Sequence, residues 1–121
     1  MKDFIIGRIK GFRYAIKGFF LLLRTEHSII TQSVIALIVI GMGFYLGISR
    51  EEWMMQLLAI GLVLSTESLN TAVEKLCDFV HPDFHDKIGF IKDIGAGAVT
   101  FAALIAVLIG IIIYYPYFLV L

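Results

Sequence analysis

The stretch GAGAVTFAALIAVLIGIIIYYPYFLVL (residues 95–121) contains no charged residue and exceeds the roughly 20 apolar residues that cross a bilayer. Residues 29–48 form a second uncharged stretch of 20 residues. A third apolar run begins near Trp53 and continues to Leu64. The 121-residue chain is also 60% hydrophobic, with a mean hydropathy of +0.92. We therefore predict an integral membrane protein whose helical bundle has three spans.

The cysteine count and the length limit which kinds of site and how many domains the chain can have. The chain has one cysteine, Cys77, which excludes an internal disulfide framework and a multi-cysteine metal site. Its length suggests one domain. We expect a single integral-membrane domain over residues 1–121, with an amphipathic helix in residues 1–27 and membrane helices in residues 29–48, 53–78 and 93–118.

The amino-terminal arm is basic and has a helical stripe of apolar residues. Its apolar residues recur every three to four positions: Phe4, Ile5, Ile9, Phe12, Ile16, Phe19, Phe20 and Leu23. Such a helix either lies in the cytoplasmic leaflet or packs on the membrane spans of its own chain. Charges from Arg8 to Lys17 interrupt any signal-peptide core. We expect no nucleic-acid partner, because the rest of the chain belongs in lipid.

The basic residues also predict the orientation. Six lie before the first span, whereas only Arg50 lies in the turn at residues 49–52. Lys87 and Lys92 lie in a solvent-side loop that we expect over residues 79–94, around the helix breaker Pro82. Basic loops stay in the cytoplasm. This predicts a multi-pass membrane protein with its amino terminus and this loop on the cytoplasmic side.

Small residues recur along the third span. Ala98, Ala102, Ala106 and Gly110 are four positions apart and form a ridge that another helix can approach closely. A monomer of three spans would expose its polar residues to lipid. We therefore expect a homo-oligomer.

Four polar residues share one face of the second span: Glu67, Asn70, Glu74 and Asp78. Their spacing places them within about 80° and along about 17 Å of helix. An ionisable residue inside a membrane is costly, so Glu67, the deepest, is interpreted as functional. Clustered carboxylates can hold Mg²⁺ together with phosphates. Glu74 and Asp78 could instead be solvated at the cytoplasmic boundary.

Two further features suit a nucleotide. Lys92 and Asp93 precede a run of small residues, 95–98, which lets an anion approach the backbone, although these residues could serve helix packing alone. Neither standard phosphate-binding loop is present. Glu26 either completes the cation site or pairs with Arg24 or Lys17. The three histidines lack the spacing of a zinc site.

The motifs resemble those of the bacterial membrane-integral diacylglycerol kinase and undecaprenol kinase family. They are ESLNTAVE (residues 67–74) with the later Asp78, and KDIGAGAV (residues 92–99). The resemblance covers essentially the whole chain, including YAIKG (residues 14–18) and Glu26. It departs from the family pattern at residues 27–29 and at Ser68, but neither departure removes a carboxylate of the motifs.

The resemblance implies a homotrimer that transfers the γ-phosphoryl group of ATP to a membrane lipid alcohol, at sites shared between protomers. It implies Glu67 as general base and Glu26 and Glu74 as Mg²⁺ ligands. The remaining residues that it places at the nucleotide site are Tyr14, Asn70, Asp83, His85, Lys92 and Asp93. Either diacylglycerol or undecaprenol could be the acceptor.

A different class of function fits part of the pattern. A small oligomeric transporter could use Glu67 as an intramembrane carrier of protons or cations. Such a carrier would not require Glu26, Glu74 or the Lys92–Asp93 pair, and it would not need a nucleotide. Transfer of labelled phosphate to a lipid distinguishes the two classes.

Overall fold

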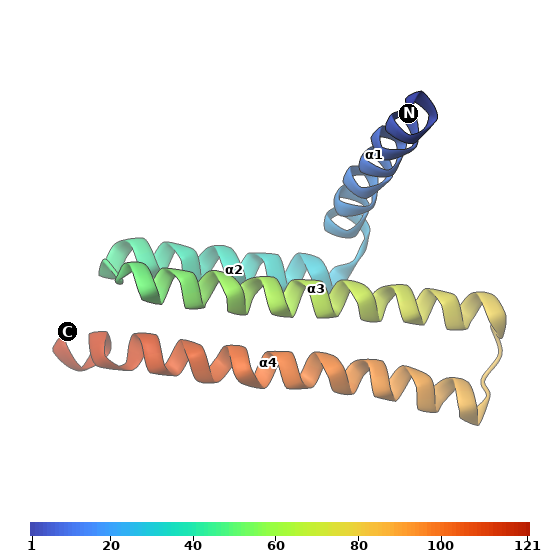
Figure 1. Cartoon of the computed structure of the whole chain (residues 1–121). Coiled ribbons are helices and arrows are strands. Elements are labelled where there is room, and N and C mark those ends of the chain that lie inside the picture. Colours follow the sequence, from blue (N-terminus) through green and yellow to red (C-terminus); the bar gives the residue numbers. More distant parts are fainter.

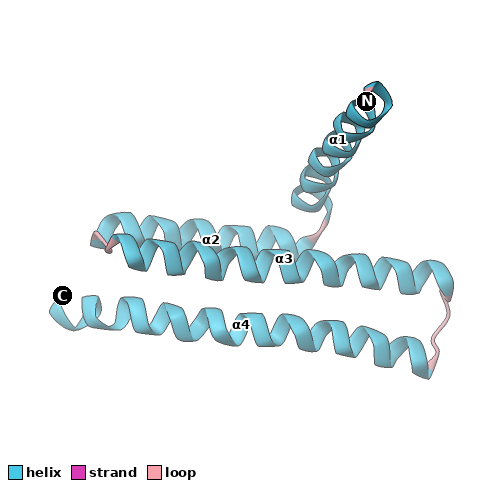
Figure 2. Ribbon diagram, in the orientation of Figure 1, coloured by secondary structure: helices cyan, strands magenta, loops and turns pink.

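The computed structural model describes residues 1–121 and contains four α-helices and no strand. The helices are α1 (Lys2–Thr25), α2 (His27–Leu46), α3 (Arg50–Val80) and α4 (Asp86–Val120). Helices α2, α3 and α4 run alongside one another and alternate in direction, whereas α1 projects away from them (Figure 1; Figure 2). The expected all-helical fold is confirmed.

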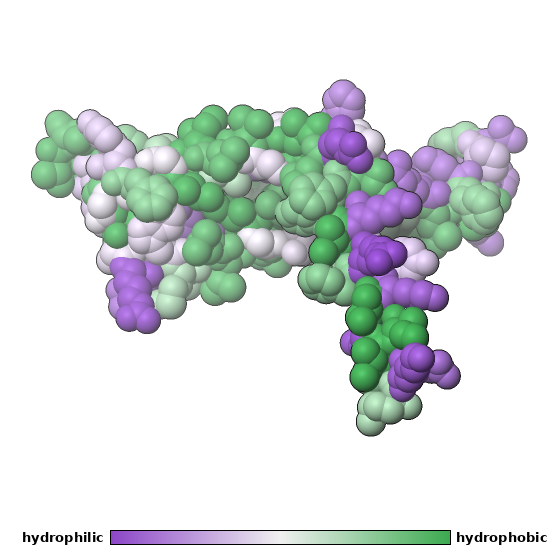
Figure 3. Space-filling view, turned by 90° about the horizontal axis from the view of Figure 1, so that it is seen from above, coloured by the Kyte–Doolittle hydropathy of each residue, from purple (hydrophilic) through white to green (hydrophobic).

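Three of the helices are long and apolar enough to cross a membrane. The most apolar segments of α2, α3 and α4 have mean hydropathies of 2.1, 1.2 and 2.7. Only 13 of the 121 residues are buried, so most apolar side chains face outward. Figure 3 shows this hydrophobic surface over the bundle, with hydrophilic residues gathered at its ends and along α1. Such a surface requires lipid or other protein chains to cover it.

Helices α3 and α4 are longer than α2. At 1.5 Å per residue, the 20 residues of α2 span about 30 Å, whereas the 31 of α3 and 35 of α4 span about 46 and 52 Å. Both helices extend beyond the first residue of α2, toward the turn that joins them (Figure 1). We call this extension the α3–α4 overhang. The turn and the helix ends beside it carry most of the predicted site residues: Glu74, Asp83, His85, Lys92 and Asp93.

The turn between α3 and α4 is shorter than the sequence predicted. The expectation of a loop over residues 79–94 is wrong, because α3 continues to Val80 and α4 begins at Asp86. Pro82 does break the helix. His85 then starts the next one, since its Nδ1 accepts a hydrogen bond from the backbone N–H of Lys87 at 3.1 Å. Charged residues such as Lys92 keep this segment out of hydrocarbon, but they do not prevent it from being helical.

The opposite end of the bundle is held by caps and tyrosines. Ser49 and Glu52 form a capping box at the start of α3, which satisfies two backbone N–H groups. The Tyr117 hydroxyl donates to Glu52 Oε1 at 2.7 Å. The Tyr114 hydroxyl lies against Gln56 and against the Val39 carbonyl oxygen, which is 3.0 Å away. These contacts tie α4 to both α2 and α3 at this end.

Candidate active site

The polar face of α3 is directed toward the first turns of α4. Asn70 is buried, with 7% of its surface exposed, and its Nδ2 donates to Glu74 Oε1 at 3.1 Å. Its Oδ1 has no hydrogen-bond donor and lies against Gly95 of α4. The absence of a side chain at Gly95 is what admits Asn70 between the helices. The amide thus fixes the direction of the Glu74 carboxylate.

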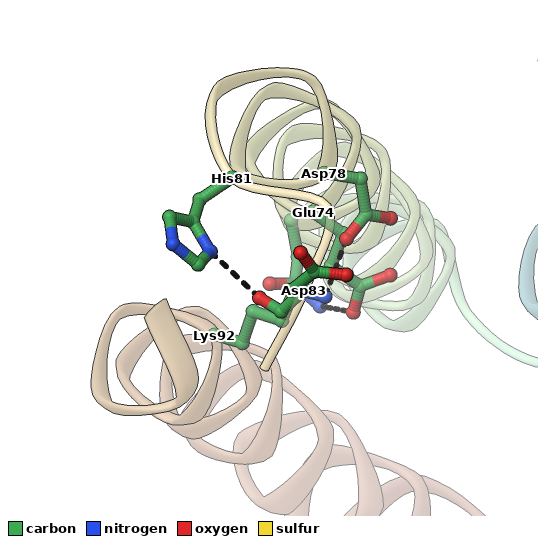
Figure 4. A network of polar contacts seen from close by, with 6 residues as sticks. Glu74, Asp78, His81, Asp83 and Lys92 are labelled. Atoms are coloured by element: carbon green, nitrogen blue, oxygen red, sulfur yellow. Dashed lines mark hydrogen bonds and ion pairs between the residues drawn. The ribbon is translucent and has the colours of Figure 1, made fainter. Parts of the chain in front are cut away.

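One helical turn farther along α3, Asp78 joins the two helices through an ion pair. Lys92 Nζ of α4 lies 2.6 Å from Asp78 Oδ1. Figure 4 shows Glu74, Asp78 and Lys92 meeting between α3 and α4. Three of the residues that the motifs singled out are therefore close together, although 14 positions separate Lys92 from Asp78 in the sequence.

Glu26 reaches the same helix from another direction. It is the only residue between α1 and α2, and its extended backbone (φ −98°, ψ 111°) breaks the helix there. Its Oε1 lies 3.1 Å from Lys75 Nζ, and its side chain is 22% exposed. The partner of Glu26 is therefore a lysine of α3 and is neither Arg24 nor Lys17. This contact of Lys75 was not predicted from the sequence, in which its place next to Glu74 is the one signal.

Glu67 lies deeper along α3 and is only partly exposed. Its carboxylate makes no side-chain hydrogen bond or ion pair within the chain, while Ser68 beside it bonds back to the Leu64 carbonyl oxygen. Seven residues, about 10 Å of helix, separate Glu67 from Glu74. The carboxylate therefore remains available to a partner from outside this chain.

The remaining predicted site residues make no side-chain hydrogen bond or ion pair with this cluster. Tyr14 is exposed on α1, whose contacts are mainly with α2. Asp93 is exposed and makes no side-chain bond. In the turn, His85 caps α4, and the backbone oxygen of Asp83 lies 2.7 Å from Nδ1 of His81 (Figure 4).

The cluster can accept a cation only with help from other ligands. No group of three or more His, Cys, Asp or Glu side chains within the chain could hold a metal ion. Mg²⁺, however, is commonly held by one or two carboxylates together with substrate phosphates and water. The Lys75 ammonium already stands against the Glu26 carboxylate, one residue from Glu74. The charges and oxygen donors of Glu26 and Glu74 suit a cation of this kind.

Comparison with known proteins places the chain in a family. Residues 13–114 match the family described as prokaryotic diacylglycerol kinase, which is most of the chain. The chain belongs to this family. All the predicted site residues, from Tyr14 to Asp93, lie within the matched range.

Individual members of the family match along most of their length. The chain is 36% identical to undecaprenol kinase of Bacillus subtilis (strain 168) over 107 residues, 88% of this chain and 87% of that protein. It is 29% identical to diacylglycerol kinase of Haemophilus influenzae over 94 residues, 78% of this chain and 80% of that protein. It is 26% identical to diacylglycerol kinase of Escherichia coli (strain K12) over 110 residues, 91% of this chain and 90% of that protein.

Proposed function

We propose that the protein is a lipid kinase that transfers the γ-phosphoryl group of ATP to the hydroxyl group of undecaprenol or diacylglycerol. The observation that carries this proposal is the similarity to an undecaprenol kinase, 36% identical over 88% of this chain, within a family of kinases. The polar cluster between α3 and α4 is consistent with it. No observation favours the alternative of a proton or cation transporter.

Glu67 is the proposed general base. The hydroxyl group of a lipid alcohol reaches the site from the hydrocarbon side of the membrane. Glu67 is the carboxylate of α3 that lies deepest. It makes no ion pair within the chain, so it is free to accept the hydroxyl proton as the oxygen attacks phosphorus. Phosphoryl transfer otherwise requires mainly positioning and charge stabilisation.

The nucleotide is proposed to bind farther out along the α3–α4 overhang. Glu26 and Glu74 would hold Mg²⁺, which neutralises charge on the phosphates. Asn70 orients Glu74 through its 3.1 Å hydrogen bond. Lys92, positioned by Asp78, supplies a cation for phosphate oxygens. Tyr14, Asp83, His85 and Asp93 are proposed as further contacts to the nucleotide.

The proposed membrane placement follows from charge. Nine of the ten Lys and Arg residues lie in α1 or in the parts of α3 and α4 near the turn that joins them, which favours the cytoplasmic side of a bacterial cell membrane for this end. Helix α1 is proposed to be an amphipathic surface helix, with its basic face toward anionic headgroups. We also propose a homotrimer with sites shared between protomers, which would cover part of the apolar surface of the bundle.

Substitution of Glu67 tests the proposal directly. Purified protein in mixed micelles is given γ-labelled ATP, Mg²⁺ and one lipid alcohol at a time. We expect labelled lipid from the unmodified chain, and Glu67→Gln to lower turnover by at least about 100-fold, since general bases contribute about 10²–10⁴-fold. Glu51→Gln, at the opposite end of α3, is the matched control and should retain full activity.

Two results would contradict the proposal. Label in neither lipid, from protein that unfolds cooperatively and is therefore folded, would argue against the kinase itself. Near-normal turnover of Glu67→Gln would leave the kinase in place but remove Glu67 as its base. A comparison of the two acceptors at equal concentration identifies the preferred lipid.

A further inference from the structure

The kinase proposal gives no role to the ion pair between Lys75 and Glu26. Lys75 Nζ lies 3.1 Å from Glu26 Oε1, and the Lys75 side chain is 68% exposed. Lys75 follows Glu74 directly in α3. A cation is thus already held at a carboxylate that is proposed to bind Mg²⁺.

We propose that Lys75 is a resident counter-ion of Glu26 that competes with the divalent metal for this carboxylate. This inference rests on the proposed function, because it assumes that the metal–nucleotide complex binds at Glu26. The ammonium ion neutralises Glu26 and holds its side chain against α3. Metal binding then requires the ammonium to leave.

The geometry makes this exchange feasible. Lysine carries its charge on a flexible four-carbon stem, and the side chain of Lys75 is mostly in solvent, so leaving Glu26 costs it little desolvation. An exposed ion pair is also weak compared with the binding of a metal–nucleotide complex. The pair is therefore strong enough to place the carboxylate and weak enough to be displaced.

The same ion pair lies at the junction between α1 and α2. Glu26 is the only non-helical residue between those helices, and its backbone N–H still bonds to the Leu22 carbonyl oxygen at 3.2 Å. While Lys75 holds Glu26, it also anchors this junction to α3. The exchange of cations at Glu26 would accordingly change how firmly the junction is held.

The test measures metal binding apart from catalysis. Mn²⁺ bound in the presence of a non-hydrolysable ATP analogue is counted from the loss of the free Mn²⁺ signal in electron paramagnetic resonance. We expect Lys75→Met to tighten Mn²⁺ binding about two- to five-fold, the range expected for loss of an exposed ion pair. Lys87→Met, which removes a lysine from the same end of the molecule, is the control and should change nothing.

A second pair of variants shows whether Lys75 acts through Glu26. In a Glu26→Gln background, Lys75→Met should no longer alter Mn²⁺ binding, because its partner is gone. Unchanged or weaker binding by Lys75→Met alone would overturn the inference, as would an equal effect in both backgrounds. Failure of the unmodified chain to bind Mn²⁺ and the analogue at all would instead contradict the proposed kinase function.

Discussion

Replacement of Gly95 by alanine tests how closely α3 and α4 approach each other at the site. A β-carbon at position 95 would overlap Asn70 Oδ1 and would lie 3.3 Å from Asn70 Cγ. Asn70 is buried and is held by its bond to Glu74, so it cannot give way freely. Either its side chain must rotate away from Glu74, or the two helices must separate.

The effect of Gly95→Ala on the free energy of unfolding follows from these contacts. Loss of the Asn70–Glu74 hydrogen bond costs about 0.5–1.5 kcal/mol. Overpacking between helices costs about 1–3 kcal/mol. Alanine regains about 0.5–1 kcal/mol over glycine in a helix. We therefore expect Gly95→Ala to lower the free energy of unfolding by about 0.5–4 kcal/mol, which is the cost of overpacking and of the lost bond less the gain in helix propensity.

Gly97→Ala is the matched control, because a β-carbon there meets nothing within 4 Å. It should leave stability unchanged or raise it by about 0.5–1 kcal/mol. Denaturant unfolding in detergent micelles, followed by circular dichroism, gives both values, and lipid phosphorylation is measured on the same samples. If Gly95→Ala proved as stable and as active as Gly97→Ala, the close approach of Asn70 to α4 would be refuted.

The remaining predictions concern the start of α3 and the Lys92 ion pair. Ser49→Ala removes the capping box and should lower the free energy of unfolding by about 1 kcal/mol in the same unfolding measurement, with kcat unchanged because the cap lies at the far end from the site. Asp78→Asn should change the free energy of unfolding by less than about 1 kcal/mol, since the Lys92–Asp78 ion pair is partly exposed. It should nevertheless raise the KM for ATP, because Asp78 no longer holds the Lys92 ammonium in place. Lys92→Met should raise the KM for ATP further. Steady-state kinetics with varied ATP measure this KM, and an unchanged value in either variant would contradict the proposed role of Lys92.

The membrane helices were predictable from the sequence because the signals are local. Uncharged stretches of 20 or more residues indicate spans, and Pro82 marks the break between α3 and α4. The helix boundaries were harder to predict from the sequence. Charge at Lys87 and Lys92 shows that a segment avoids hydrocarbon, but it says nothing about whether that segment is helical. That distinction explains why a loop was expected where α4 has its first two turns.

The polar contacts between helices could not be predicted in the same way. Spacing places Asn70, Glu74 and Asp78 on one face of α3, but it does not give the register of α4 against that face. Only the register brings Gly95 onto Asn70 and Lys92 onto Asp78. The pairing of Glu26 with Lys75 likewise depends on how the chain turns between α1 and α2. Contacts between residues that are distant in the sequence can be identified only from the packed structure.

The unequal helix lengths bear on how two dissimilar substrates could meet. The α3–α4 overhang carries Glu74, Asp78 and Lys92 away from the end of the bundle that Ser49 and Tyr117 hold together. Glu67 lies about 10 Å deeper on the same face of α3, two helical turns from Glu74. In the proposed mechanism a water-soluble triphosphate binds along the α3–α4 overhang, while the hydroxyl group of a lipid reaches Glu67 from the hydrocarbon side. The reacting oxygen and phosphorus then meet between the two carboxylates, and neither substrate has to leave its own phase.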